Sequence, residues 1–224
     1  MTIEELGELL NMLREQYDPK WYVCVLTQFL LGMRASEVLS IQLWDFKNDF
    51  SKLDYRQAKT NKIISDEPVP SALRLALISY IVNNLHRFKN GYLFSKDMGN
   101  GIRIVTTVYG AFWAKWRKAC AKRFGVHWVD RYDIPNGQRR YRICSHSLRR
   151  LHRTSLTKNV ESGEYNKDWL ISQICHYDDF KTFLKYKNEF EVLEARKEFI
   201  EPALQPVISR VLGMSKGQTS ISDF

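Results

Sequence analysis

Several features that mark other protein classes are missing from this sequence of 224 residues. It has no apolar run near the roughly 20 residues that a membrane-spanning helix needs. Its acidic start, "MTIEELGELL", lacks the basic flank and apolar core of a secretory signal. The cysteines include no CxxC pair, which argues against a disulfide framework and the common zinc spacings; they are Cys24, Cys120, Cys144 and Cys175. We therefore expect an intracellular protein with reduced thiols.

Acidic residues are scarce relative to basic ones. The chain has 34 Lys and Arg against 25 Asp and Glu, a formal net charge of +9. This excess favours a polyanionic partner, and nucleic acid is a better candidate than an anionic membrane surface. Hydrophobic residues make up 44% of the chain, enough for the core of a single domain. We expect that domain to span residues 1–213, with a polar, disordered tail at 214–224.

The first part of the sequence has the pattern of helices. Thr2 and Glu5 form a capping-box signature ahead of leucines at helical spacing. A second apolar helix, "WYVCVLTQFLL", stops at Gly32, a residue suited to a left-handed C-terminus. Ser36 is then expected to cap a short helix, "EVLSIQL". Arg34 would lie in the tight link between these two helices.

Short segments replace this pattern between Trp44 and Val69 and predict a small antiparallel sheet, with "KTNK" in a hairpin turn. One helix is expected from Ser71 to Asn90-Gly91, and another, "VYGAFWAKWRKACAKRF", should end at Gly125. Residues 126–142 read as a loop or hairpin, and a further helix starts near Ser145. The expected fold is α+β, mainly helical with a small antiparallel sheet.

The stretch "CSHSLRRLHRTSL" carries an unusual density of cations. His146 and Arg149 are three residues apart, so they share one helix face, and Arg153 extends that face by a turn. Guanidinium and imidazole groups on one face suit a phosphate, although a solvated basic face is the simpler alternative. A Cys/His metal site is disfavoured because the adjacent Cys175 and His176 are awkward ligands for one tetrahedral ion.

Four motifs, in order, carry a family resemblance: "LLGMRASEVLSI", "AKTNK", "HSLR" and "ICHYDDFKTFLKY". Together they resemble the tyrosine recombinase/integrase family and its catalytic domain. The resemblance implies that Glu37 orients the first arginine and that Lys62 is the alternative to the hairpin lysine. The catalytic residues that it implies are Arg34, Lys59, His146, Arg149, His176 and Tyr186. The chain departs from the family pattern at Cys175, where glycine is usual, and at Arg150, where histidine is common.

The resemblance implies a site-specific recombinase that breaks and rejoins DNA through a covalent 3′-phosphotyrosyl intermediate, without metal, ATP or other cofactor. The arginines would stabilise charge on the scissile phosphate, Lys59 would protonate the leaving oxygen, and Tyr186 would attack. Simpler interpretations of single residues remain open. In these, Lys59 is an ordinary lysine of a hairpin turn and Tyr186 is a half-buried aromatic residue. His152 lies off the catalytic face and is expected to be structural.

Double-stranded DNA is the expected partner, bound by a homotetramer whose free form is a monomer. The segment after Tyr186 is expected to dock on a neighbouring protomer, or alternatively to fold back on its own core. Because the family carries an N-terminal DNA-binding domain ahead of the first helix, we expect an isolated catalytic domain or a minimal enzyme. The alternative functions are an inactive DNA-binding protein of this fold and a type IB topoisomerase-like enzyme. Expected phosphate contacts are Lys115, Arg117, Lys118, Arg131, Arg139 and Arg153.

Overall fold

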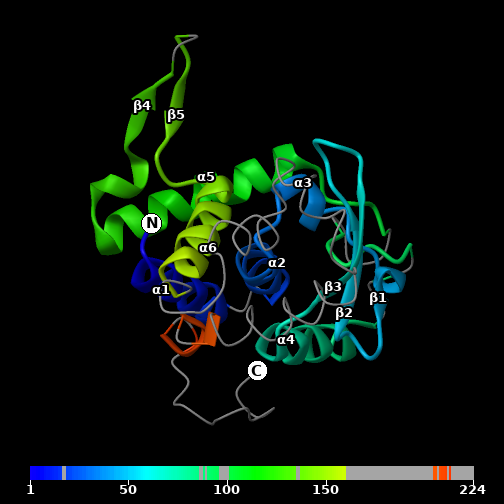
Figure 1. Ribbon diagram of the computed structural model, residues 1–224. Helices are drawn as coiled ribbons and strands as arrows, with labels where there is room; N and C mark the ends of the chain where they lie inside the picture. The colour runs from blue at the N-terminus through cyan, green and yellow to red at the C-terminus, as the bar shows by residue number, and fades with distance from the viewer. Residues whose placement is uncertain are drawn as a thin grey trace.

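The computed structural model combines helices with two small antiparallel sheets (Figure 1), so the α+β class is confirmed. The residues that it describes are 1–16, 19–85, 88, 90–95, 101–134, 137–159, 204–205, 207–210 and 212, without the side chains of 156–159. Within these ranges, no helix is both long and apolar enough to cross a membrane.

Helix α2 (Pro19–Leu30) is the central helix, and α1 (Ile3–Glu15) packs along it (Figure 1). The predicted capping box starts α1: the Thr2 N–H donates to the Glu5 carboxylate at 2.6 Å, and the Glu5 N–H donates to the Thr2 hydroxyl at 3.2 Å. Helix α1 buries the leucines of one face, whereas α2 is buried on almost every side. This apolar centre fixes the elements that carry the candidate site.

The link after α2 follows the prediction in part. Gly32 adopts φ +59°, the left-handed conformation expected at the end of a helix. The next helix, α3 (Ala35–Val38), differs from the expectation, because it begins one residue before Ser36 and is only four residues long. Arg34 is the N-cap, and its N–H donates to the carboxylate of Glu37 at 2.6 Å. The Glu37 carboxylate therefore accepts the N–H of the N-cap residue, and Ser36 lies inside the helix and not at its cap.

The predicted sheet is present. After the 3-10 turn η1 (Leu43–Asp45), the strands β1 (Phe46–Lys47), β2 (Lys52–Arg56) and β3 (Ile63–Pro68) pair antiparallel in that order. The pairing of β2 with β3 shifts register between Leu53 and Tyr55. The hairpin turn between them contains "KTNK", as expected.

Helix α4 (Ser71–Val82) is shorter than the sequence predicted, because it stops well before Asn90-Gly91. Its C-cap is Asn83, and the side chain of Asn84 donates to the backbone carbonyl of Tyr80 at 2.7 Å. A side-chain amide thus takes an acceptor at the end of the helix, which is how asparagine competes with helical hydrogen bonds.

Helix α5 (Thr106–Phe124) ends at Gly125, as predicted, and buries an aromatic face. The chain continues through η3 (Val126–Val129) into the strands β4 (Arg131–Asp133) and β5 (Arg139–Tyr141). These two strands form a hairpin that projects from the body of the protein (Figure 1). Helix α6 (Ser145–Asn159) then packs against α2, so the predicted start near Ser145 is confirmed.

The described part of the last segment lies beside α1 (Figure 1). Leu204, Val207 and Ile208 are buried, and the guanidinium of Arg210 pairs with the carboxylate of Glu4 at the start of α1. These residues therefore fold back on their own chain, which is the alternative that the sequence analysis placed second. The predicted tail at 214–224 lies outside the described residues.

Candidate active site

The side chain of Glu37 joins three separate parts of the chain. It is only 1% exposed, and its Oε1 accepts hydrogen bonds from the Arg34 guanidinium at 2.8 Å and from the Ala58 N–H at 3.0 Å. Its Oε2 lies 3.9 Å from the guanidinium of Arg149. One carboxylate therefore holds α3, the β2–β3 hairpin turn and α6 together. We call Arg34, Glu37, Ala58, Arg149 and His146 the Glu37 cluster.

Glu37 is ionised at neutral pH despite its burial. Burial alone raises the pKa of a carboxyl group, but hydrogen bonds from the Arg34 backbone and guanidinium and from the Ala58 N–H outweigh it. The pKa of Glu37 therefore lies below its ordinary value. The resulting fixed negative charge balances part of the positive charge of the two arginines.

Arg149 occupies the second turn of α6 and is 6% exposed. Its guanidinium donates to the backbone carbonyl of Gly32, at the left-handed turn after α2. Burial, followed by the charges of Arg153 and Arg34, lowers its pKa, and Glu37 acts in the opposite direction. A guanidinium stays protonated under such shifts, so Arg149 is a cation with a fixed orientation.

His146 lies one turn before Arg149, and its side chain reaches the surface. Desolvation by its surroundings lowers its pKa, and the nearby positive charges lower it further; they are those of Arg149, Arg150, Arg153 and Arg34. The imidazole is therefore neutral at pH 7 and can both donate and accept a hydrogen bond. The shared electrostatic environment places His146 next to the arginines of the cluster.

Lys59 and Lys62 lie in the turn between β2 and β3, and both are exposed. Lys59 directly follows Ala58, whose N–H bonds Glu37, whereas the Lys62 carbonyl accepts the Gln57 N–H at 2.8 Å and closes the turn. The structure thus brings the lysine-bearing turn to the arginines. Lys59 and Lys62 both remain candidates for the hairpin lysine.

Two predicted catalytic residues, His176 and Tyr186, lie outside the described residues. His152 is the buried, structural residue that the sequence predicted. It is 4% exposed, its ring meets Phe29 edge-on, and an added Cβ at Gly32 would lie 2.4 Å from its Cδ2 atom. Burial lowers the pKa of His152 to about 3, so its ring is neutral at physiological pH.

Two components of the cluster were missed by sequence reasoning. The Gly32 carbonyl and the Ala58 N–H are backbone groups, so no side-chain pattern identifies them. Only the positive φ of Gly32 has a sequence signal, and that signal indicates a turn and not a hydrogen-bond acceptor.

The expected phosphate contacts lie in different environments, and the prediction for Arg117 was wrong. Arg117 is 7% exposed, lies 3.7 Å over the ring of Tyr141 and donates to the Ile143 carbonyl at 3.4 Å, so it supports the β4–β5 hairpin from inside. Lys115 and Lys118 are exposed, whereas Arg153 is half-buried. Arg131 and Arg139 belong to the hairpin.

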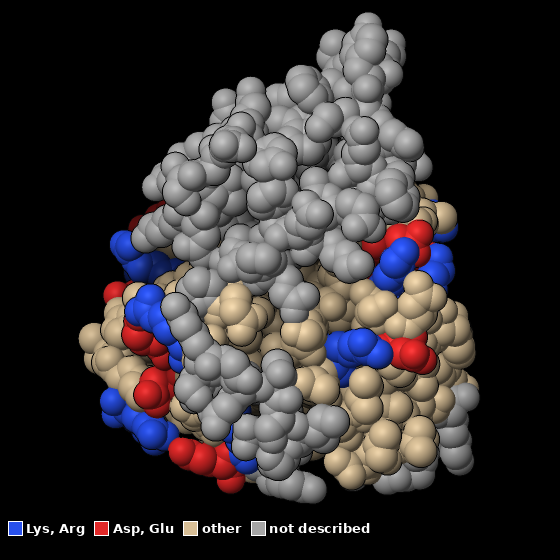
Figure 2. Space-filling model, turned by 60° about the horizontal axis from the view of Figure 1, so that its bottom comes forward, with Lys and Arg blue, Asp and Glu red and all other residues tan. Residues whose placement is uncertain are grey.

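Basic residues do not gather on every face of the described structure. Figure 2 shows one face on which the coloured Lys and Arg side chains lie next to Asp and Glu. The described positive charge of this face is therefore largely balanced, in contrast to that around His146.

No family model, curated protein or solved structure matches this chain. Among the described residues, no group of three or more His, Cys, Asp or Glu side chains is placed to hold a metal ion, and Cys24, Cys120 and Cys144 are free. The functional argument therefore rests on the Glu37 cluster and on the order of motifs in the sequence.

Proposed function

We propose that this chain is a tyrosine recombinase-like enzyme that cleaves and rejoins DNA strands inside the cell. The observation that carries the proposal is the convergence on Glu37 of Arg34, Arg149 and the lysine-bearing hairpin turn. These groups come from three distant parts of the sequence, and the resemblance assigns each of them to one phosphodiester. A solvated basic face offers no reason for a shared buried carboxylate.

The two arginines suit the charge that develops during phosphoryl transfer. Glu37 bonds the Arg34 guanidinium and forms an ion pair with that of Arg149, and the Nη1 group of Arg149 also donates to the Gly32 carbonyl, so the orientation of both arginines is set before substrate binds. Their remaining N–H donors can stabilise the non-bridging oxygens, on which charge increases in the transition state. Such preorganised donors act on the transition state more than on the ground state.

The remaining roles follow the resemblance. His146, neutral at pH 7, hydrogen-bonds the phosphate and assists proton transfer. Tyr186 attacks the phosphorus and forms the 3′-phosphotyrosyl bond, while Lys59 gives a proton to the departing 5′ oxygen. The reverse reaction rejoins the strand, because the covalent bond conserves the energy of the broken linkage. The substrate is duplex DNA, on which we propose a homotetramer of a protein that is monomeric when free.

The decisive experiment is covalent trapping on a pool of nicked duplex DNA substrates, followed by denaturing electrophoresis. Tyr186→Phe keeps the aromatic ring and removes only the hydroxyl group. Tyr177→Phe is the matched control, because Tyr177 lies too close to His176 to match the family spacing. We expect an adduct from the wild type and from Tyr177→Phe, and none from Tyr186→Phe.

Other outcomes decide between the alternatives. An adduct that persists in Tyr186→Phe would keep the chemistry and reject this tyrosine. If no adduct forms on DNA that the protein demonstrably binds, the chain is a DNA-binding protein without strand-cleaving activity. Relaxation of supercoiled DNA without site preference would favour a type IB topoisomerase-like enzyme.

A further inference from the structure

The two faces of the β4–β5 hairpin differ in whether their charged side chains are paired with other described residues. The cross-strand pairs are Arg131 with Tyr141, Tyr132 with Arg140, and Asp133 with Arg139. Because successive side chains of a strand point to opposite faces, one face carries Arg131, Asp133, Arg139 and Tyr141. We call it the paired face, and the face of Tyr132 and Arg140 the free face.

Cations of the paired face are bound within the protein. Arg131 bonds the Tyr141 hydroxyl and lies 4.3 Å over its ring, with Arg117 at 3.7 Å from the same ring. The Nε of Arg139 lies 3.3 Å from the carboxylate of Asp133. These contacts hold the hairpin together, so this face offers less unpaired charge to an external anion.

The free face carries cations that form no ion pair within the part of the chain that the structure describes. Arg140 is exposed, and so is Arg142, which continues the same side of the chain because its N–H donates to the Asp130 carbonyl. Neither guanidinium forms an ion pair with a described side chain, the nearby Asp130 included. The two residues lie about 6.8 Å apart along the strand, and Tyr132, 38% exposed, adds an aromatic surface beside them.

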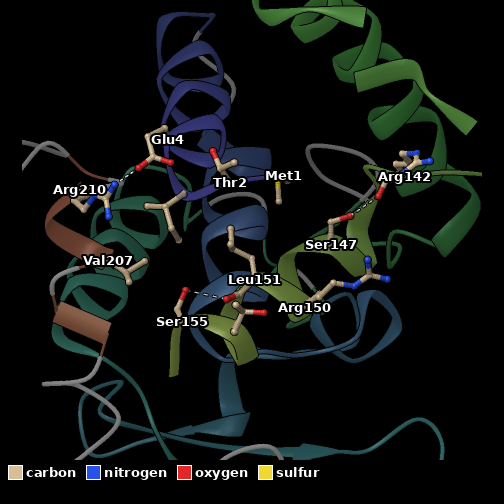
Figure 3. Close-up of a pocket in the computed structure, with 12 residues that line it drawn as sticks. Met1, Thr2, Glu4, Arg142, Ser147, Arg150, Leu151, Ser155, Val207 and Arg210 are labelled. Atoms are coloured by element: carbon tan, nitrogen blue, oxygen red, sulfur yellow. Dashed lines mark hydrogen bonds and ion pairs between the residues drawn. The ribbon is translucent and has the colours of Figure 1, made fainter. Parts of the chain in front are cut away.

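This series of cations continues to the candidate active site. Arg142 lines a cavity of about 490 Å³ together with Arg150 of α6, and both lie on the same side of that cavity (Figure 3). Across the cavity, Arg210 is neutralised by Glu4. Arg150 is exposed and directly follows Arg149 of the Glu37 cluster on α6, and its charge is one of those that lower the pKa of His146.

We propose that Arg140, Arg142 and Arg150 form a phosphate-binding track for duplex DNA, leading from the free face of the hairpin to the Glu37 cluster. The choice of DNA as the ligand rests on the proposed function. The track itself rests on the exposure of the three arginine side chains, on their lack of ion pairs with described residues and on their positions in the fold. Exposed guanidinium groups that form no ion pair with a described side chain, beside an exposed aromatic ring, suit the phosphate backbone of a polyanion. On this hairpin, the phosphate contacts expected from the sequence were Arg131 and Arg139, whose charges are already bound by Tyr141 and Asp133. Arg140 and Arg142 were not among the expected contacts.

The test compares the two opposite faces of one hairpin. Wild type, the double variant Arg140→Gln/Arg142→Gln and the control Arg139→Gln are titrated with a short fluorescein-labelled duplex of mixed sequence, at about 50 to 200 mM salt. For the double variant we expect affinity at least about fivefold lower and a slope of log K against log salt smaller by about 1.8, since each lost phosphate contact removes about 0.9. Arg139→Gln should change both quantities little. Unchanged circular dichroism and thermal melting show that the variants fold.

A wild-type slope in the double variant, or an equal loss in Arg139→Gln, would overturn the track. Tighter binding of an RNA duplex of the same sequence would overturn the choice of DNA. The covalent trapping assay keeps this result separate from the proposed function. An adduct with an unchanged salt slope supports the enzyme and rejects the track, whereas a reduced slope without any adduct supports the track on a DNA-binding protein.

Discussion

The Glu37 cluster and the β4–β5 hairpin are both rich in arginine, but they use it differently. In the cluster, Arg149 is buried and bound by a carboxylate and a backbone carbonyl. In the hairpin, Arg139 is 63% exposed and pairs with Asp133, which is 78% exposed. Desolvated pairs hold a group in one orientation, whereas exposed pairs contribute little beyond long-range attraction. Under the proposed function, the cluster therefore positions a phosphate, and the cations on the free face of the hairpin attract one.

The largest contrast is expected from removing one acid in each region. Glu37→Gln keeps the size of the side chain but leaves Arg34 and Arg149 without their shared carboxylate, so we expect a loss of about 3–5 kcal/mol in the free energy of unfolding. Asp133→Asn should cost no more than about 1 kcal/mol, because that pair is exposed. Urea unfolding of both variants measures the difference. Equal losses would contradict the distinction between the two regions.

Two glycines give the second contrast, because both adopt a positive φ. Gly32→Ala places a Cβ against the His152 ring, and we expect a loss of about 2–3 kcal/mol from overpacking and backbone strain together. At Gly137, φ +77°, an added Cβ meets nothing within 4 Å, so Gly137→Ala should cost only about 1 kcal/mol for the backbone conformation. Thermal unfolding of the two variants measures which one loses more stability. A Gly137→Ala variant as unstable as Gly32→Ala would show that the crowding by His152 is unimportant.

Lowering the pH should reduce the free energy of unfolding through His152 and Glu37. The pKa of His152 is about 3 in the folded protein and about 6.5 in the unfolded chain, so only the unfolded chain gains a proton between these values. Stability should therefore fall as the pH drops below about 6.5, by up to about 1.4 kcal/mol per pH unit. Further down, Glu37, whose pKa is lowered by folding, loses its stabilising charge in the same direction.

The measurement is the urea midpoint at pH 7 and at pH 5, in the wild type and in His152→Gln. The variant lacks the titrating ring, so its midpoint should depend less on pH even if its overall stability is lower. An unchanged pH dependence in His152→Gln would assign the effect to other groups.

Local signals in the sequence predicted much of the framework. The Thr2 and Glu5 capping box, the turn at Gly32 and the end of α5 at Gly125 all depend on interactions within a few residues, and all are confirmed. The predicted cap at Ser36 was wrong, because the helix begins at Ala35 and its N-cap is Arg34, whose N–H bonds the Glu37 carboxylate. The predicted length of the helix after Ser71 was wrong because Asn84 ends it with its side chain.

Long-range contacts were harder to predict. The sequence grouped Arg34, His146 and Arg149 through the resemblance, but it contained no sign that the Gly32 carbonyl accepts from Arg149 or that the Ala58 N–H donates to Glu37. Arg117 was misplaced for a related reason. It was expected to contact phosphate together with its neighbours Lys115 and Lys118, whereas the ring over which it lies, Tyr141, comes from a hairpin later in the chain.

The bond between the hairpin turn and Glu37 has a consequence for sequence variation. Its donor is the backbone N–H of Ala58, which every amino acid except proline supplies. Position 58 is therefore free to vary in side chain without releasing the turn from the arginines, whereas Glu37 has no such freedom. Selection on this geometry therefore acts on the carboxylate of Glu37. In a library of substitutions at position 58, only the proline variant should lose the bond between the turn and Glu37.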